Sequence, residues 1–362
     1  INIFRDPRWG RGHETYGEDP HLTGELGKAF IRGLQGNGEY MKAAACAKHF
    51  AVHSGPEGLR HEFDAKVSQK DLWETYLPAF EACVKEADVE SVMGAYNRTN
   101  GEPCCGSHTL LTDILREKWG FQGHVTSDCW AIADFHEHHK VTTNAVESAA
   151  MAIHNGCDLN CGSVFLQALA AVQEGLLDES DIDRACENLM ATRIRLGMMA
   201  DDCEYDSIPY TENDTPEHHQ IALKAAEKSM VLLKNDGILP LDPAALSSVA
   251  VIGPNADSRI MLRGNYNGTA SRSYTVLEGV QAVLGDKVRV YYSEGCHLYK
   301  DSVEEGLARS NDRLAEAVFT ARQADVVLLC LGLDGEYEGE EGCTSNPYGA
   351  GDKGDSVSYT HL

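Results

Sequence analysis

The sequence predicts an α/β protein in which a parallel, barrel-type domain is followed by a second parallel α/β domain. Short apolar runs alternate with helical segments along most of the chain, which is typical of βαβ units. Polar residues recur where these runs end, as they do at the carboxyl-terminal mouth of a barrel. A polar, turn-rich stretch over residues 199–216 separates two such series and indicates a linker.

The composition limits the classes of function. The chain has 362 residues, enough for a large core, and 31 basic against 56 acidic residues give a net charge of −25. This charge argues against nucleic acids and anionic membranes as partners, because phosphates would be repelled. No apolar run approaches the roughly 18 residues needed to span a bilayer. A neutral substrate such as a small glycoside or an oligosaccharide fits better, and the sequence leaves the oligomeric state open.

No metal site is expected. Neither the pair Cys104–Cys105 nor Cys157 with Cys161 has the spacing of a zinc site. The run His136-Glu137-His138-His139 is interpreted as a solvated helix or loop, since neighbouring residues on one turn point in different directions.

The twelve cysteines are scattered, and we expect them to be mostly reduced. Cys46, Cys83 and Cys330 lie in apolar runs, where a small buried thiol is the usual explanation. This usage favours a cytoplasmic protein. The chain begins with Ile1 rather than Met, so a secretion signal before it stays open.

The first twenty residues are too charged and glycine-rich for a strand or a helix. A long loop dense in Arg, Glu and Trp is typical of a binding surface. Asp19-Pro20 then predicts a helix start, with Asp as the cap and Pro at the first position. The apolar residues of this helix that we expect to face the core are Leu22, Leu26, Ala29, Phe30 and Ile31.

Four apolar runs in the first half are predicted strands with polar ends. They cover residues 43–50, 90–97, 123–128 and 156–160. Predicted helices cover residues 68–87, 110–119, 145–154, 163–175 and 180–197. The polar residues at the strand ends are Lys48, His49, Tyr96, Asn97, Asp128 and Asp158. Several such ends together predict one site built from several barrel strands.

Asp128 is the predicted nucleophile. It ends a β-branched run and is followed by helical sequence, which would present its carboxylate at the mouth of a barrel. The alternative is that Asp128 caps the following helix. The other polar strand ends favour the catalytic role.

The second half repeats the alternation and predicts another parallel α/β domain. Its strands are expected over residues 249–253, 288–292 and 326–331, and its helices over 216–233, 274–284 and 303–324. The turn at 253–256 lacks the repeated glycines of a dinucleotide site, so a Rossmann cofactor is not expected. The last strand runs into an acidic loop over residues 332–341.

Several motifs resemble, in order, those of glycoside hydrolase family 3. They are Arg5-Asp6-Pro7-Arg8-Trp9-Gly10-Arg11 with Glu14 and Gly17-Glu18-Asp19-Pro20, Lys48-His49, Tyr96-Asn97, Ser127-Asp128, and Leu232-Leu233-Lys234-Asn235 with Leu239-Pro240-Leu241. The resemblance covers roughly residues 1–355. It implies a retaining exo-glycosidase with an (α/β)8 TIM-type barrel followed by an α/β sandwich, and no metal or organic cofactor.

The same resemblance implies roles for single residues. Asp128 matches the nucleophile, and Tyr96 would lie beside it. Arg11, Lys48 and His49 would bind sugar hydroxyls in the −1 subsite. Glu14 and Trp130 are further candidates for substrate binding.

The acid/base of the family comes from the second domain. Glu338 best matches the first Glu of a Glu-x-Glu pattern, with Glu340 and Glu341 as close alternatives and Glu336 as a weaker one. A retaining glycosidase needs two carboxyls about 5–5.5 Å apart, one ionised and one protonated, so their pKa values must be pushed apart by their surroundings.

Substrate class is predicted from three short segments. Residues 103–105, 127–129 and 158–162 look closer to β-xylosidase and α-L-arabinofuranosidase members than to β-glucosidases. We therefore predict a β-xylosidase. A β-glucosidase, a catalytically silent sugar-binding module and a sugar phosphorylase are the alternatives. The related N-acetylglucosaminidases are disfavoured, because Lys48-His49-Phe50 continues differently here.

Departures from the family suggest a fragment. We expect a catalytic barrel over 1–200 that lacks its first strands, a linker over 201–215, an incomplete sandwich domain over 216–355, and a tail over 356–362 that fits no family pattern. An incomplete barrel leaves strand edges unpaired, so we expect poor activity of this chain alone.

Overall fold

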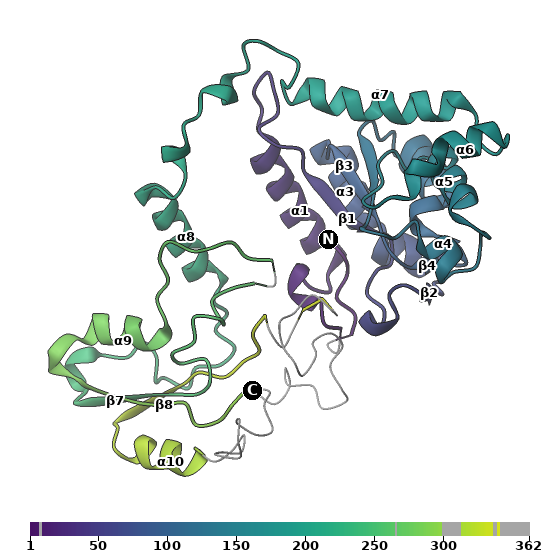
Figure 1. The fold of residues 1–362 in the computed structure, drawn as a ribbon. Helices are drawn as coiled ribbons and strands as arrows, with labels where there is room; N and C mark the ends of the chain where they lie inside the picture. Colours follow the sequence, from purple (N-terminus) through teal and green to yellow (C-terminus); the bar gives the residue numbers. More distant parts are fainter. Residues whose placement is uncertain (7–8, 265, 299–312, 336–338, 341–362) are drawn as a thin grey trace. The chain divides into compact units, whose positions relative to one another are not determined.

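The computed structural model of the chain describes residues 1–6, 9–264, 266–298, 313–335 and 339–340. They fall into two compact units, Ile1–Ser207 and Ile208–Leu362. Each unit is an α/β structure with its own sheet (Figure 1). In the described residues no helix is both long and apolar enough to cross a membrane.

The main sheet of the first unit consists of three parallel strands in the order β1-β3-β6. They are β1 (Cys46–Phe50), β3 (Ser91–Gly94) and β6 (His124–Ser127). Phe50, Val92 and Val125 are fully buried, as expected of a parallel sheet that is covered on both faces. The parallel βαβ order is therefore confirmed.

This sheet is open in the described residues, and no closed barrel is found there. The predicted fourth strand over 156–160 is wrong in extent, because only Leu159 forms a parallel bridge, to Thr126. The backbone N–H groups of Asp158 and Leu159 both donate to the Val125 carbonyl, at 2.8 and 3.0 Å, which interrupts a regular ladder.

Helix α1 (Pro20–Gln35) lies beside α3 (Pro78–Ala87) (Figure 1). The Asp19 side chain accepts a hydrogen bond from the Leu22 N–H at 2.7 Å, so the predicted cap is confirmed. The predicted core face is wrong except for Ile31. The exposed residues are Leu22, Leu26, Ala29 and Phe30.

Small residues explain the face that α1 does bury. A Cβ at Gly27 would lie 2.9 Å from the Cys83 Sγ, and one at Gly24 would lie 3.4 Å from the Ala82 Cβ. The two glycines therefore allow α1 to approach α3 closely, which turns the larger apolar residues outward.

The predicted helix over 68–87 is divided into parts. Ser68 caps α2 (Gln69–Asp71) as expected, accepting from the Asp71 N–H at 3.1 Å. A wide π-type turn over Leu72–Tyr76 follows, and α3 begins anew at Pro78, which has no N–H for a continuous helix.

The remaining elements of the first unit follow the predicted order. A π-type helix covers His108–Lys118, and Gly120 ends it at φ 74°. The helices are α4 (Asp134–Glu137), α5 (Ala145–His154), α6 (Ala168–Gln173) and α7 (Glu179–Arg195). A small second sheet has the order β2-β4-β5, with β2 (Asp64–Ala65), β4 (Arg98–Thr99) and β5 (Glu102–Pro103).

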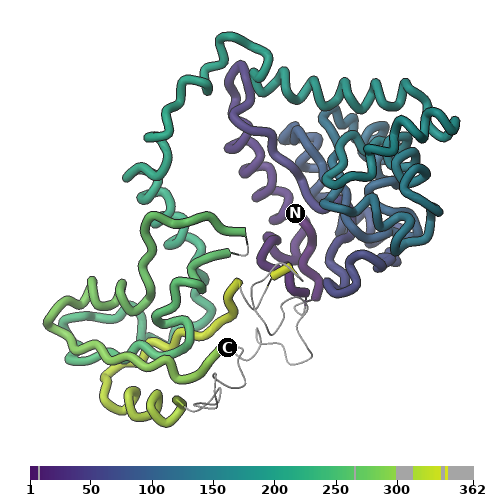
Figure 2. Tube along the Cα trace, in the orientation of Figure 1, coloured from purple at the N-terminus to yellow at the C-terminus, as the bar shows by residue number. Residues whose placement is uncertain are grey.

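The second unit has a parallel sheet, as predicted, and its strands lie in the order β8-β7-β9. In Figure 2 the chain can be traced from α7 through residues 196–215 into α8 (Pro216–Ser229). The strands are β7 (Ser248–Ile252), β8 (Arg289–Ser293) and β9 (Val326–Leu329). The helices beside them are α9 (Val276–Leu284) and α10 (Leu314–Arg322).

The run after Phe135 differs from the prediction. His139 is only 5% exposed and its ring stacks on Phe135, with ring centroids 6.2 Å apart, so a fully solvated run is wrong. The turn is fixed by the His139 N–H, which donates to the Asp134 carbonyl at 2.7 Å. Among the described residues, no group of three or more His, Cys, Asp or Glu side chains could hold a metal.

Burial of His139 predicts an acid-sensitive fold. Burial lowers the pKa of His139 to about 4, and the charges of Arg98 and His138 act in the same direction. An unfolded histidine titrates near 6.5, so the unfolded chain binds the proton first as the pH falls. Stability should therefore decrease between about pH 6.5 and pH 4, by on the order of 3 kcal/mol from this group.

Urea unfolding of wild type and His139→Gln at pH 7 and pH 4.5 measures this contribution. The loss of unfolding free energy on acidification should be smaller in the variant. His21→Gln, on the exposed face of α1, is the matched control and should behave as wild type. An equal loss in wild type and His139→Gln would contradict the prediction.

Candidate active site

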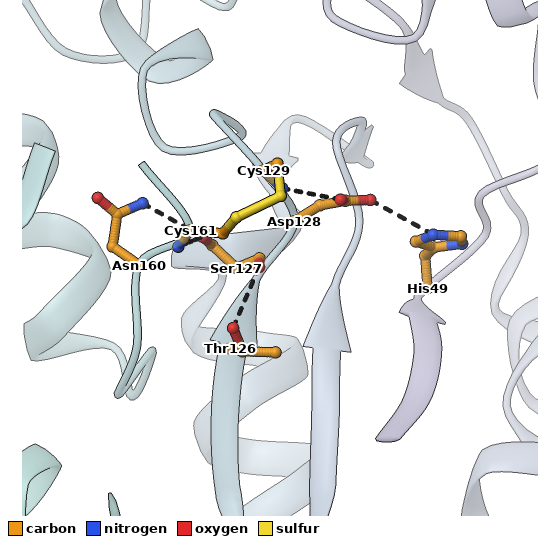
Figure 3. The surroundings of a disulfide bond; sticks show 7 residues. All are labelled: His49, Thr126, Ser127, Asp128, Cys129, Asn160 and Cys161. Carbon is orange, nitrogen blue, oxygen red and sulfur yellow. Dashed lines mark hydrogen bonds and ion pairs between the residues drawn. A yellow bond between two sulfur atoms is a disulfide. The ribbon is translucent and has the colours of Figure 1, made fainter. Parts of the chain in front are cut away.

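Asp128 follows the last residue of β6 and is only 8% exposed. Its backbone N–H donates to the Gly94 carbonyl of β3 at 3.2 Å. The side chain points toward β1: Oδ1 accepts from the Cys129 N–H at 2.8 Å and Oδ2 lies 3.3 Å from the His49 Nε2 (Figure 3). A helix-capping role is not seen, because α4 begins only at Asp134 and has no side-chain cap.

Asn2 determines which ring nitrogen of His49 carries the proton. Its amide bridges the backbone of residue 49: Nδ2 donates to the His49 carbonyl at 2.9 Å, and Oδ1 accepts from the His49 N–H at 3.1 Å. The same Oδ1 lies 2.9 Å from the His49 Nδ1, which must therefore carry the ring proton. Burial holds the pKa of His49 well below its ordinary value, and the nearby His53 and Arg11 lower it further. His49 is thus neutral, with a lone pair on Nε2.

Arg11 is the central cation of the site and is 2% exposed. It forms two hydrogen bonds with Glu14, from Nε to Oε1 at 2.8 Å and from Nη2 to Oε2 at 2.9 Å. Its Nη2 also lies 3.1 Å from the His49 Nε2, which accepts from it. A continuous series of contacts therefore leads from Glu14 through Arg11 and His49 to Asp128.

Glu14 links Lys48 to this group. The Lys48 Nζ lies 3.5 Å from the Glu14 Oε2. Burial opposes the ionisation of Glu14, but the hydrogen bond and charge of Arg11, with the charge of Lys48, outweigh it and lower the pKa of Glu14. The site thus offers both charged donors and charged acceptors beside Asp128, a combination suited to hydroxyl groups.

Tyr96 and Trp130 lie at the margins of this group. The Tyr96 ring contacts His53 at 6.2 Å and His61 at 4.9 Å between centroids. Trp130 is 59% exposed, and its backbone N–H donates to the Cys161 carbonyl at 2.7 Å. The predicted sugar-binding residues are therefore brought to one end of the sheet, with Trp130 beyond Cys129.

Asp158 belongs to another cluster, contrary to the prediction of one shared site. Its carboxylate accepts from Arg116 at 2.9 Å, from the Val125 N–H at 2.7 Å and from Asn188 at 2.9 Å. Burial raises its pKa despite the charge of Arg116. Asp158 thus ties β6 to two helices and has a structural role.

Three further residues of the site were not predicted from sequence patterns. Asn2 lies in a short apolar run, and His53 and Glu57 lie in the loop after β1. Glu57 is 1% exposed and accepts from the Trp9 Nε1 and the Arg60 Nη1, both at 3.1 Å. The contact of Trp9 with Glu57 joins residues 48 positions apart, and that of Asn2 with His49 joins residues 47 positions apart, which no local pattern reveals.

A disulfide joins Cys129 to Cys161 next to Asp128 (Figure 3). The prediction of mostly reduced cysteines holds for the other described cysteines, and this pair is the exception. The two residues are 32 positions apart and meet only because Leu159 pairs with β6. Cys46, expected to be buried, is exposed at the start of the edge strand β1. A cytoplasmic location stays a prediction.

Of the four glutamates considered for the acid/base, Glu336, Glu338 and Glu341 lie outside the described residues. Glu340 belongs to the second unit, is 8% exposed and accepts a hydrogen bond from the Tyr266 hydroxyl. The choice among these residues stays a prediction.

Comparison with known families decides the identity of the chain. Residues 1–192 match the glycosyl hydrolase family 3 N-terminal domain, and residues 230–358 match the C-terminal domain of the same family. The chain belongs to glycosyl hydrolase family 3. The resemblance drawn from the sequence motifs is thereby confirmed.

Two relatives show the similarity in sequence. A xylan 1,4-beta-xylosidase from Xylanibacter ruminicola is 46% identical over 313 residues, which are 84% of this chain and 36% of that protein. A probable beta-D-xylosidase 7 from Arabidopsis thaliana is 41% identical over 358 residues, which are 94% of this chain and 45% of that protein. The chain therefore spans less than half the length of these relatives.

Solved structures show the same fold. A family 3 exo-beta-xylosidase in complex with a xylobiose aziridine activity-based probe has a TM-score of 0.86 at 33% identity, over 97% of this chain and 44% of that one. A beta-glucosidase from Listeria innocua in complex with isofagomine has a TM-score of 0.81 at 32% identity, over 94% of this chain and 47% of that one.

The disulfide should stabilise the first unit. Closing a loop over 32 positions removes chain entropy from the unfolded state, worth about 3–4 kcal/mol. The double variant Cys129→Ser with Cys161→Ser should lose that much unfolding free energy in urea denaturation. Cys186→Ser, at an exposed free cysteine, is the control and should unfold as wild type does. An unfolding free energy of the double variant equal to that of Cys186→Ser would contradict the prediction.

Proposed function

We propose that this chain carries the nucleophile and the sugar-binding residues of a retaining exo-β-glycosidase, most specifically a β-xylosidase. The observation that supports it is the Asp128 carboxylate at the end of β6, 3.3 Å from a neutral His49 that contacts the Arg11–Glu14 pair. The names of the relatives in sequence favour β-linked xylose as the sugar that is released. The β-glucosidase structures among its neighbours support the alternative sugar.

In this mechanism the ionised Asp128 attacks the anomeric carbon. The bond between that carbon and the leaving oxygen breaks, and the oxygen takes a proton from a carboxylic acid about 5–5.5 Å from Asp128. The conjugate base then deprotonates a water, which releases the sugar from Asp128. His49 is neutral and carries its ring proton on the Asn2 side, so it does not cancel the charge that Asp128 needs for attack.

The sugar in the −1 subsite would contact the residues around Asp128. Arg11, Lys48 and Glu14 present charged hydrogen-bonding groups to hydroxyls, with the ring nitrogen of His49 between them and Asp128. Tyr96 would lie at the border of this subsite, because its ring contacts the ring of His53. Since Arg11 and Glu14 also bind one another, their orientation is fixed before a sugar arrives.

The second domain would supply the acid/base, for which we propose Glu338, with Glu340 and Glu341 as alternatives. The domain organisation in this proposal is part of an (α/β)8 TIM-type barrel over 1–200, a linker over 201–215 and part of an α/β sandwich over 216–355. It is supported by the family matches to residues 1–192 and 230–358.

Covalent labelling tests the proposal. A xylose-configured aziridine should be opened by the Asp128 carboxylate: a carbon–oxygen bond forms, the carbon–nitrogen bond breaks, and the nitrogen takes a proton. Mass spectrometry of the digested chain should locate the label on Asp128, and Asp128→Asn should abolish it. Asp183→Asn, at an exposed carboxylate of α7, should label normally. Labelling that persists in Asp128→Asn would refute the assignment of the nucleophile.

A further inference from the structure

The guanidinium of Arg11 lies between two imidazole rings. Its Nη2 lies 3.1 Å from the His49 Nε2, and its Nη1 lies 3.4 Å from the His53 Nε2. Both rings are buried, and their centroids are 4.7 Å apart. A guanidinium donates hydrogen bonds and never accepts them, so the Nε2 of each ring must be the acceptor. Neither ring therefore carries its proton on Nε2.

A second amide, that of Asn97, contacts the ring of His53. The Asn97 Oδ1 lies 3.3 Å from the His53 Nδ1, and Asn97 is fully buried. Its Nδ2 donates to the Arg98 carbonyl at 2.9 Å and to the Ala51 carbonyl at 3.5 Å, which determines which end of the amide faces the ring. Because an amide oxygen only accepts, the proton of His53 must lie on Nδ1.

The two rings thus have the same tautomer, and each assignment rests on contacts at both ring nitrogens. The amide of Asn2 is oriented by the backbone of His49, as that of Asn97 is by the two carbonyls. Burial holds the pKa of His53 well below its ordinary value, and the charge of Arg11 lowers it further. The hydrogen bond with Asn97 acts in the opposite direction and is outweighed. His53 is therefore a neutral acceptor, as His49 is.

The position of the ring protons matters because of what lies beside each Nε2. A proton on the His53 Nε2 would set a donor against the donors of Arg11 and would push the guanidinium from its place beside Glu14. A proton on the His49 Nε2 would also donate to the Asp128 Oδ2, which is 3.3 Å away. A donor there would stabilise the charge of the carboxylate and so reduce its reactivity as a nucleophile.

We propose that Asn2 and Asn97 are positioning residues of the reaction. Through its Oδ1, each amide holds the proton of its histidine on Nδ1. Asn2 thereby withholds a ring proton from Asp128, and Asn97 withholds one from Arg11. The inference rests on the proposed function, because it takes Asp128 as the nucleophile and Arg11 as a group that binds the sugar.

The charges around the two rings determine how a carboxylate in place of either amide would act. The cations among them lower the pKa of both rings. An added carboxylate would oppose these cations and raise the pKa of the ring that it contacts. The titratable and charged groups that face the rings are Arg11, Lys48, Arg60, Asp128, the amino group of Ile1 and, for each ring, the other histidine.

Nuclear magnetic resonance of the chain with isotope-labelled histidine tests the tautomers directly. Long-range proton–nitrogen correlation spectra distinguish a ring protonated on Nδ1 from one protonated on Nε2. Spectra of His49→Gln and His53→Gln assign the signals. In wild type both rings should carry their proton on Nδ1 at pH 7.

Labelling by the xylose-configured aziridine tests the two roles. In Asn2→Asp, the maximal labelling rate relative to wild type should be about tenfold lower at pH 5.5 than at pH 8. The reason is that the introduced carboxylate raises the pKa of His49 toward its ordinary value, and the protonated ring then donates to Asp128. In Asn97→Asp, the aziridine concentration that gives half the maximal rate, again relative to wild type, should instead rise about tenfold between pH 8 and pH 5.5, because Arg11 is displaced.

The matched control is Asn37→Asp, the same change at an exposed residue after α1, for which both ratios should be independent of pH. A proton on the Nε2 of either wild-type ring, or a pH-independent ratio in Asn2→Asp or in Asn97→Asp, would overturn the inference and leave the proposed function standing. Absence of label from Asp128 in wild type would overturn the proposed function and the inference with it. Should circular dichroism show that a variant is unfolded, the wild-type tautomers decide: protons on both Nδ1 atoms support the inference, and a proton on either Nε2 contradicts it.

Discussion

The buried guanidinium of Arg11 is the charge on which the site of the first unit depends. A cation that is 2% exposed is costly unless its donors are paired, and the two hydrogen bonds with Glu14 meet that need. Burial lowers the pKa of His49 and that of His53, and the charge of Arg11 lowers both further. The neutral state of both rings beside Asp128 therefore follows from their burial together with the position of Arg11.

The strand ends explain why these groups meet. The parallel register sets Gly94 of β3 opposite Ser127 of β6, and the next residue, Asp128, bonds to the Gly94 carbonyl. β1 lies on the other side of β3 and contributes His49, whose ring reaches Asp128 across the sheet edge (Figure 3). Asn2, from the start of the chain, then fixes the orientation of that ring.

Sequence patterns predicted what depends on local order and missed what depends on tertiary contact. The polar ends of the strands located Asp128, Lys48 and His49, and the cap at Asp19 was read from two residues. The buried face of α1 was predicted wrongly, because a pattern of apolar residues leaves out glycines. Gly24 and Gly27 are nevertheless the residues that approach α3. Asp158 also ends an apolar run, yet it faces Arg116, and only the fold distinguishes it from Asp128.

The segment after β6 shows how rigidity is supplied at this edge. The buried Ser127 Oγ accepts from the Cys161 N–H at 3.0 Å and from the Asn160 Nδ2 at 3.3 Å, beside the disulfide. Residues 127–130 are thus fixed to residues 159–162 by covalent and hydrogen bonds. Asp128 is directed to one side of this segment, toward His49, while Trp130 is 59% exposed. Asp128 and Trp130 are two residues apart and therefore share one rigid support, which keeps each side chain in place.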